Sequence, residues 1–545
     1  MNAYHEIDGV PCGSSKELLV DLLRHELGFA GALVADYFTI ENLESYHCVA
    51  HDRAEAARLA LEAGMDIELP ASVCYGEPLR QALDSGAVDI ALVDAAVQNV
   101  LRLKFRLGLF ENPFVDADAA MTVFDIPEQR ALARRLAQQS IVLLKNDGDL
   151  LPLDKAVGAI AVIGPCADDM RLLQGDYHYP SHLEVMSVLA HADSALPTPG
   201  SAVPAPMSGD HNLSEYFVPM VTVLAGIKAA VAPSTEVRHA RGCDINGTSR
   251  AGFAEAVALA EQSDVAIVVV GSKSGLTPDC TSGEAIDRVD LGLPGVQQEL
   301  VQAIHATGTP VVVVLISGRP LAVPWIAEHV PAVLEAWLPG EEGGAAVADV
   351  LFGDVNPGGK LPICLPRHVG QVPVFYSHKP SGARSHWYGQ YVDGSTKPLY
   401  PFGHGLSYTT FDYHNFQINP NTVSPTGAVA ISLDVTNSGT RTGDEVVQLY
   451  VRDRIASVTR PVKELKGFKR ITLVPGETRT VTFHLAVSQL GFYNREMDFV
   501  VEPGDIEVMI GSSSADIRAC GRFTITGQVT NVSNHRVYLT PVDVT

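Results

Sequence analysis

The sequence predicts an α/β protein built in three successive parts, each with its own hydrophobic pattern. Strands and helices alternate over residues 1 to about 110, which indicates a parallel sheet made of βα units. Near-continuous runs of valine and isoleucine follow between residues 136 and 375, as in strands that are covered on both faces. Regularly spaced strands separated by turns begin after residue 415 and predict a small β-sandwich.

The first part is too short for a complete barrel. Its expected strands lie near Asn2–Tyr4, Gly31–Ala35 and Asp66–Leu69, and a stretch with helical periodicity runs from His51 to Ala63. A (β/α)₈ barrel needs about 250 residues. This segment has fewer than half of them, so we expect residues 1–124 to form part of a barrel and the linker after it.

The second part, residues 125–375, is expected to be a doubly wound α/β/α sandwich. Its evidence is a set of buried strands with helical segments beside them: strands Ile160–Ile163, Val265–Val270 and Val311–Ile316, and helices Ala251–Glu261 and Val296–Thr307. The stretch 193–211 is rich in proline, serine, glycine and alanine, and it predicts a long loop.

The third part follows an irregular linker over residues 376–415. Alternating strands are expected at Val429–Val435, Glu445–Val451, Thr480–Leu485 and Gly504–Ile510. Turns such as Asn437-Ser438-Gly439 and Pro475-Gly476-Glu477 separate them. We expect a β-sandwich over residues 416–526 and a tail over 527–545.

Charge and hydropathy argue against two classes of partner. The 545 residues carry 63 acidic and 39 basic side chains, a formal charge of −24. Such a charge repels nucleic-acid phosphates and anionic membrane surfaces, so we expect no nucleic-acid and no membrane partner. No stretch approaches the roughly 20 apolar residues of a membrane span, and no signal peptide precedes the first strand, so a cytoplasmic location is the default expectation.

The eight cysteines never form a C-x-x-C pair. Their spacing suits neither a zinc site nor a dense disulfide framework, so we expect mostly buried thiols and no metal.

One candidate catalytic carboxylate is Asp36, which directly follows the apolar run Leu33-Val34-Ala35. Barrel enzymes keep catalytic groups at the carboxyl ends of parallel strands, because the loops there form the mouth. The alternative is that Asp36 caps the helix that soon follows, since aspartate is favoured at that position. Position alone leaves both interpretations open.

A second candidate is Glu284, at the end of the loop Gly271–Glu284 that follows the strand Val265–Val270. Open α/β sheets bind ligands at this edge, but the loop matches neither common phosphate-binding glycine pattern. Composition alone favours a solvated loop charge for Glu284. The nearby Asp287 is expected either to pair with Arg288 or to cap a turn.

Several blocks, in order along essentially the whole chain, resemble glycoside hydrolase family 3, which includes β-glucosidases and β-xylosidases. The blocks are GFAGALVADY (28–37), ALEAGMDIELP (60–70), SGEAIDR (282–288), LPGVQ (293–297), WLPGEEGG (337–344), NPGGKLP (356–362), YPFGHGLSY (400–408) and PVKELKGF (461–468). The resemblance implies an α/β chain with a partial (β/α)₈ barrel, then an α/β/α sandwich, then a fibronectin-III-like β-sandwich.

The resemblance also implies a function and a site. Asp36 would be the nucleophile and Glu284 the acid/base of a retaining, exo-acting enzyme on β-glucosides or β-xylosides, with the site formed between domains. No cofactor is implied, since two carboxylates suffice. Met1, Tyr4 and Tyr37 fall where the family contacts the sugar, Tyr37 replacing the usual tryptophan. Their alternative readings are an initiator methionine and ordinary barrel-core aromatics.

One departure from the family pattern affects the expected activity. The family's Lys-His pair, arginine and aspartate that grip the sugar lie upstream of the Met-x-x-Tyr strand, where this sequence begins. We therefore expect a glycosidase impaired by truncation, with an oligosaccharide or glycoside substrate and with a second copy or a complementing barrel half as partner. The alternative is a non-catalytic carbohydrate-binding or scaffold remnant. A nucleotide-binding protein is disfavoured by the missing phosphate loop.

Overall fold

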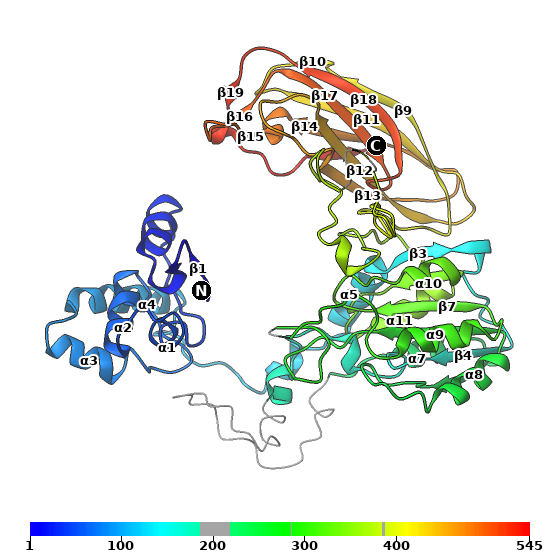
Figure 1. Cartoon of the computed structure of the whole chain (residues 1–545), viewed down its shortest axis with the longest axis horizontal. Coiled ribbons are helices and arrows are strands. Elements are labelled where there is room, and N and C mark those ends of the chain that lie inside the picture. The colour runs from blue at the N-terminus through cyan, green and yellow to red at the C-terminus, as the bar shows by residue number, and fades with distance from the viewer. Residues whose placement is uncertain (186–217, 285, 384–386, 388) are drawn as a thin grey trace. The chain divides into compact units, whose positions relative to one another are not determined.

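The computed structural model describes residues 1–185, 218–284, 286–383, 387 and 389–545 (Figure 1). Within these residues the chain divides into two compact units. Unit 1 is Met1–Phe124, and unit 2 runs from Asp125 through Val185 and on to Thr545. Among the described helices, none is both long and apolar enough to cross a membrane.

Unit 1 is mostly helical. It contains a two-stranded hairpin and several helices: β1 (Glu6–Ile7), β2 (Val10–Pro11), η1 (Cys12–Ser14), η2 (Glu17–Glu26), α1 (Asn42–Ser45), α2 (Arg53–Glu62), α3 (Glu77–Asp84) and α4 (Ile90–Arg106). Two of the three predicted strands lie side by side but share a single parallel bridge, Val34 with Ile67. The strand predicted at Asn2–Tyr4 is wrong, because that segment joins no ladder.

A buried carboxylate holds unit 1 together. Asp66 pairs with Arg24 of η2 at 2.7 Å, accepts the Leu33 backbone N–H at 2.7 Å, and accepts the Asn99 amide of α4 at 3.0 Å. The charge is thus matched by a cation and by two further donors, as a buried carboxylate requires. This one side chain fixes two helices against the segment that precedes Asp36.

Unit 2 begins with a six-stranded sheet, counted over the described residues, in the order β3-β8-β7-β6-β4-β5. The strands are β3 (Val142–Asn146), β4 (Ala159–Ile163), β5 (Glu236–Ala240), β6 (Val265–Gly271), β7 (Val311–Ile316) and β8 (Ala332–Glu335). All pair in parallel except β3, which is antiparallel to β8. The three predicted strands are confirmed as β4, β6 and β7.

Helices cover both faces of this sheet (Figure 1). They are α5 (Pro127–Ser140), α7 (Val223–Ala230), α8 (Phe253–Glu261), α9 (Gln297–His305), α10 (Pro324–His329) and α11 (Gly343–Leu351). Alternate residues of β6 and β7 belong to separate hydrophobic clusters on the two faces. This two-sided burial explains their uninterrupted apolar sequence and confirms the predicted α/β/α sandwich. The loop predicted over 193–211 lies outside the described residues.

A β-sandwich completes unit 2. In the part of the chain that is described, its sheets have the orders β10-β18-β17-β12-β13, β20-β14-β11-β9 and β15-β16-β19. The strands are β9 (Phe411–Asn419), β10 (Thr422–Val423), β11 (Ala428–Asn437), β12 (Gly443–Asp453), β13 (Glu464–Leu473), β14 (Thr478–Ala486), β15 (Phe492–Tyr493), β16 (Phe499–Val501), β17 (Gly504–Gly511), β18 (Ile517–Ile525), β19 (Thr530–Asn531) and β20 (Val542–Val544).

The last residues differ from the expected tail. β20 pairs antiparallel with β14, and β19 pairs with β16, so residues beyond 526 extend two sheets. Strands of two or three residues carry almost no periodic signal, so their pairing depends on an edge supplied by distant sequence. Short 3₁₀ turns lie at η3 (Ala120–Thr122), η4 (Asp147–Asp149), η5 (Arg171–Leu173), η7 (Val369–Gln371), η8 (Val487–Leu490) and η9 (Ser533–His535).

The cysteines are free thiols. Six are buried, while Cys48 and Cys520 are exposed. The expectation of mostly buried thiols is therefore confirmed.

The YPFGHGLSY block (400–408) connects the α/β/α sandwich to the β-sandwich. His404 donates through Nε2 to the Leu144 carbonyl at 2.9 Å, and burial lowers the pKa of its imidazole. The Tyr408 hydroxyl donates to the Val350 carbonyl at 2.9 Å. Leu406 forms a bridge with Leu143 of β3. These contacts hold the block against β3, the edge strand of the α/β/α sheet, and against α11.

A buried glutamate makes the stability of unit 2 depend on pH. Glu335, at the end of β8, has 0% of its surface exposed. Its Oε1 accepts the Trp337 N–H at 3.1 Å, whereas Oε2 has no hydrogen-bond partner among the described residues. Desolvation raises the pKa of this carboxyl well above its usual value. Because the folded pKa is raised, the stability that the carboxyl contributes is present at low pH and is lost as pH rises above about 4.3.

We therefore expect Glu335→Gln to stabilise the protein at pH 8, since the amide keeps the shape without a charge to bury. The melting temperature should rise by about 2 °C or more, and the difference should shrink toward pH 4. Calorimetry across this pH range measures the effect, with the exposed Glu261→Gln as control. A variant that is less stable than the parent at pH 8 would contradict the assignment of Glu335 as a destabilising charge.

Candidate active site

Asp36 lies at the carboxyl end of the short bridged segment in unit 1. Its backbone N–H donates to Asn2 Oδ1 at 3.1 Å, and its own Oδ1 accepts the Tyr37 N–H at 2.8 Å. Its carbonyl accepts the Thr39 hydroxyl at 2.8 Å. The N-terminal cap is Glu41 in α1 and Asp52 in the predicted helix α2, so the alternative that Asp36 caps the following helix is wrong. The backbone of Asp36 is thus held from both sides while its carboxylate stays partly accessible.

The three expected sugar-contacting residues of unit 1 are exposed. The exposed fractions are 70% for Met1, 43% for Tyr4 and 47% for Tyr37. The alternative of core aromatics does not hold for either tyrosine in this unit. Tyr37 packs edge-to-face against Phe38 with ring centroids 6.3 Å apart.

Asn2 is a residue of this region that the sequence did not single out. It is buried, and its amide oxygen holds the Asp36 backbone. No local pattern marks Asn2, because its bond to Asp36 joins residues 34 positions apart.

Glu284 ends a loop that folds back on itself in unit 2. Ser274 and Ser282 form a bridge, and the Lys273 N–H donates to Thr281 Oγ1 at 2.9 Å. Gly283 has φ +146°, and a Cβ there would come within 2.0 Å of the Gly275 carbonyl oxygen, so only glycine fits. The Glu284 side chain is exposed, in agreement with a solvated charge, but its backbone N–H donates to Asp176 Oδ2 at 2.9 Å.

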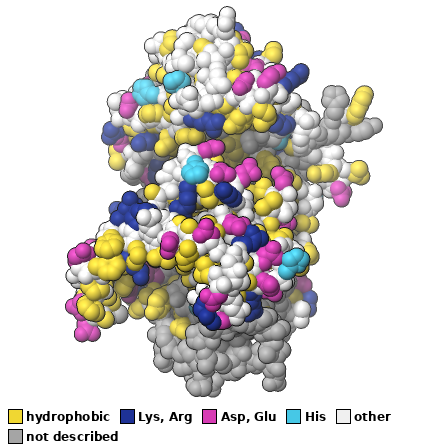
Figure 2. All heavy atoms as spheres, turned by 90° about the vertical axis from the view of Figure 1, so that its left-hand side faces the viewer, with side chains coloured by type: hydrophobic (Ala, Val, Ile, Leu, Met, Phe, Trp, Pro, Cys, Tyr) yellow, Lys and Arg dark blue, Asp and Glu magenta, His cyan; other side chains and the backbone are white. Residues whose placement is uncertain are grey.

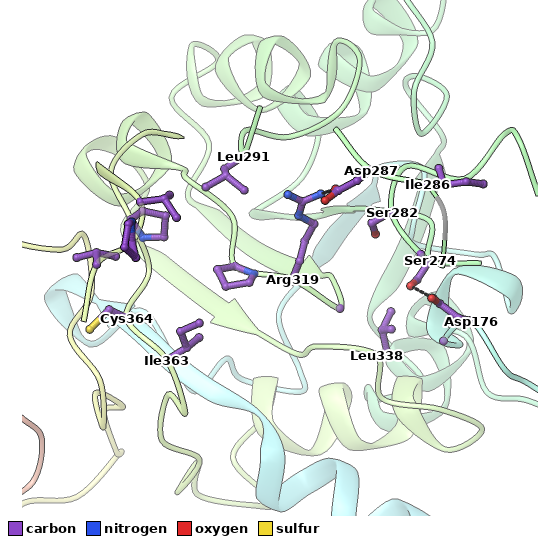
Figure 3. A pocket seen from close by; sticks show the side chains of 18 of the residues that line it. Asp176, Ser274, Ser282, Ile286, Asp287, Leu291, Arg319, Leu338, Ile363 and Cys364 are labelled. Carbon is purple, nitrogen blue, oxygen red and sulfur yellow. Dashed lines mark hydrogen bonds and ion pairs between the residues drawn. The ribbon is translucent and has the colours of Figure 1, made fainter. Parts of the chain in front are cut away.

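A cavity of about 790 Å³ adjoins this loop (Figure 3). Apolar side chains such as Leu291, Leu338 and Phe375 supply much of its wall, and Arg319 points toward Asp287 on one side. Such a mixture of apolar surface and a few convergent polar groups is typical of small-ligand pockets.

The structure corrects the expected partner of Asp287. Its carboxylate forms an ion pair with Arg319 and accepts the Arg288 backbone N–H at 2.7 Å. The backbone bond first, and then Arg319, lower the pKa of the Asp287 carboxyl. The Arg288 guanidinium instead donates to the Gly292 carbonyl at 2.9 Å. Arg319 follows β7, more than 30 residues later, so local spacing could not reveal it.

The predicted site residues fall into two groups. Met1, Tyr4, Asp36 and Tyr37 belong to unit 1, and Glu284 with its cavity belongs to unit 2. Within the described residues there is no group of three or more histidine, cysteine, aspartate or glutamate side chains that could hold a metal ion.

Models of known families match three segments of the chain in order. The glycosyl hydrolase family 3 N-terminal domain matches residues 1–103, and the corresponding C-terminal domain matches residues 141–408. A fibronectin type III-like domain matches residues 445–514. The predicted order of barrel part, sandwich and fibronectin-III-like domain is thereby confirmed as a fold class.

Curated relatives and solved structures agree with these matches. A β-xylosidase of Formosa agariphila is 42% identical over 521 residues, covering 94% of this chain and 67% of that protein. A periplasmic β-glucosidase of Salmonella typhimurium is 38% identical over 549 residues, covering 95% and 66%. A β-glucosidase structure from Erythrobacter marinus is 37% identical, with a TM-score of 0.81 and coverage of 96% and 67%. A mutant β-glucosidase from Listeria innocua, in complex with laminaribiose, is 31% identical, with a TM-score of 0.80 and the same coverage.

The present chain spans about two thirds of the length of these proteins. The similarity nevertheless extends over nearly all of its own residues, through both family 3 domains and the fibronectin-III-like domain. The chain belongs to glycosyl hydrolase family 3.

Proposed function

We propose that this chain carries the nucleophile and the acid/base of a retaining, exo-acting β-glycosidase that cleaves glucosides or xylosides at the non-reducing end. The observation that carries the proposal is the 42% identity to a β-xylosidase along 94% of the chain, followed by 38% identity to a β-glucosidase. The laminaribiose complex of the Listeria innocua enzyme supports an oligosaccharide substrate. The relatives make a purely structural or carbohydrate-binding role the less favoured alternative.

The proposed chemistry needs two carboxylates in opposite protonation states. The ionised Asp36 attacks the anomeric carbon while the glycosidic C–O bond breaks, and the protonated Glu284 gives its proton to the departing oxygen. Water then loses a proton to the Glu284 carboxylate and displaces Asp36, which returns both groups to their starting states. Two inversions at one carbon yield net retention. In retaining glycosidases the two carboxyl groups are generally about 5–5.5 Å apart.

The surroundings of Asp36 suit this role. Tyr37 presents a partly exposed aromatic ring next to the nucleophile, as stacking on a sugar face requires. Met1 and Tyr4 belong to the segment whose Asn2 holds the Asp36 backbone, and we assign both to the sugar-binding subsite. No cofactor takes part in either step.

We further propose that unit 1 binds a complementing barrel half. Phe105, Leu107 and Phe110, at and after the end of α4, are each more than half exposed, as is Leu27 after η2. On the surface drawn in Figure 2, hydrophobic side chains gather in patches between charged ones. Such patches are typical of surfaces that other protein segments cover.

The test is hydrolysis of 4-nitrophenyl β-glucoside and β-xyloside by the purified chain, alone and mixed with the barrel portion of a family 3 relative. We expect slow turnover alone, at least tenfold faster turnover with the barrel portion, and a β-configured sugar as the first product in proton NMR. Sugar binding without turnover in either form would favour the carbohydrate-binding alternative. An α-configured first product would exclude the retaining mechanism. Acceleration at higher concentrations of the chain alone would instead identify a second copy as the partner.

A further inference from the structure

Asp176 joins a separate part of the chain to the Glu284 loop. It lies just after η5, about a hundred residues before Glu284. Its Oδ2 accepts the Glu284 N–H at 2.9 Å, and its Oδ1 accepts the Ser274 hydroxyl. Figure 3 shows Asp176 and Ser274 pointing toward one another at the edge of the cavity. One carboxylate therefore bridges the outgoing and returning arms of the loop.

The Ser274 end of this bridge is fixed independently. Arg171 is 8% exposed and donates through Nη2 to the Ser274 carbonyl at 2.8 Å. Its Nε donates to Glu184 at 2.6 Å, which matches the buried charge. Gly275 packs against the same guanidinium, so closely that a Cβ there would come within 2.3 Å of Nη2. Ser274 is thus held through its carbonyl by Arg171 and through its hydroxyl by Asp176.

The Glu284 end has no comparable support of its own. Among the described residues, the Glu284 carboxyl makes no hydrogen bond or ion pair, and the side chain is exposed. Its position is therefore set through its backbone. The bond from the Glu284 N–H to Asp176 therefore fixes that backbone.

We propose that Asp176 is a positioning residue for the acid/base, fixing the Glu284 backbone so that its carboxyl meets the leaving-group oxygen. The inference rests on the proposed role of Glu284. A misplacement of about 1 Å can cost roughly 100-fold in rate, so a bond to the backbone can be as important as one to the side chain. In this role Asp176 acts on the reaction through its bond to the Glu284 backbone.

The experiment compares four variants of the full chain. Asp176→Ala removes both bonds. Asp176→Asn keeps them, because Oδ1 accepts the Glu284 N–H while the amide donates to the Ser274 hydroxyl. Ser274→Ala removes only the second bond and serves as a milder variant if Asp176→Ala folds poorly. Asp279→Ala is the matched control, since Asp279 pairs with Lys273 in the same loop but has no bond to Glu284.

The first readout is amide hydrogen exchange of the intact chain, followed in the proteolytic fragment that covers residues 281–288. We expect Asp176→Ala to speed exchange at the Glu284 amide by roughly 10- to 100-fold, as loss of a hydrogen bond to a charged group predicts. Asp176→Asn and Asp279→Ala should stay within about threefold of the parent. Unchanged exchange in Asp176→Ala would overturn the proposal. This readout needs no turnover, so it stands even if the proposed glycosidase function fails.

The second readout is kcat/KM on aryl β-glycosides, measured with the barrel portion present. For Asp176→Ala we expect a loss of roughly 10- to 100-fold with the poor leaving group phenol, and of less than about threefold with 2,4-dinitrophenol. Asp176→Asn should restore near-parent values. If Asp176 were merely structural, Asp176→Ala would lower kcat/KM equally for both substrates, because a smaller fraction of the protein would be folded. That pattern would overturn the positioning role.

Discussion

Replacing Asp36 with alanine is expected to abolish turnover of aryl β-glycosides, with a loss of roughly 10⁴-fold or more in kcat. Without the carboxylate no covalent intermediate can form, whatever the leaving group, so 2,4-dinitrophenyl and phenyl glycosides should fail together. The measurement is kcat for both substrates with the barrel portion supplied. Asp84→Ala is the matched control, because Asp84 is an exposed carboxylate of the same unit whose ion pair is with Arg80 on the same helix.

Added azide provides a further check on the same variant. Azide enters the space left by the side chain and attacks the anomeric carbon once, so the product should be an α-glycosyl azide. This single inversion distinguishes a lost nucleophile from a damaged fold, which azide could not rescue. Near-normal activity of Asp36→Ala would remove the proposed mechanism altogether.

Glu284→Ala should instead discriminate between substrates. Poor leaving groups depend on proton donation, so kcat/KM for phenyl glycosides should fall by roughly 10²–10⁴-fold. The 2,4-dinitrophenolate ion leaves without a proton, so kcat/KM for its glycosides should fall far less. Azide should yield a β-glycosyl azide, because the covalent intermediate still forms on Asp36 and is displaced from the opposite face.

The control for Glu284 is Glu261→Ala, an exposed carboxylate at the end of α8 in the same unit. Glu261→Ala should leave kcat/KM unchanged for both substrates. An equal loss with both leaving groups in Glu284→Ala would exclude Glu284 from the acid role. Comparison with Asp176→Ala then distinguishes the acid from the residue that positions it. Both variants should lose more kcat/KM with poor leaving groups than with good ones, but the size of the loss should differ.

Much of the fold is readable from local pattern. The uninterrupted runs of β6 and β7 predict strands covered on both faces, because each alternate residue must find an apolar layer. The helix of unit 1 predicted at His51–Ala63 appears as α2, with Asp52 as its N-terminal cap. Family resemblance reaches further, since short blocks of residues single out Asp36 and Glu284 where composition alone favours a solvated loop charge for Glu284.

The remaining features depend on contacts between distant residues. The ion pair of Asp287 with Arg319, the pairing of β20 with β14, and the bridge from Asp176 to Glu284 each join segments that have no periodic relation in sequence. Side-chain hydrogen bonds of this kind depend on distances of a few ångströms that only the packed chain creates. The sequence alone thus establishes the family, the order of the domains and the two candidate carboxylates. Only the packed structure shows which residues hold the backbone of each carboxylate. A backbone amide that bonds to a distant side chain does not change the local sequence pattern around it, so the sequence cannot reveal the bond.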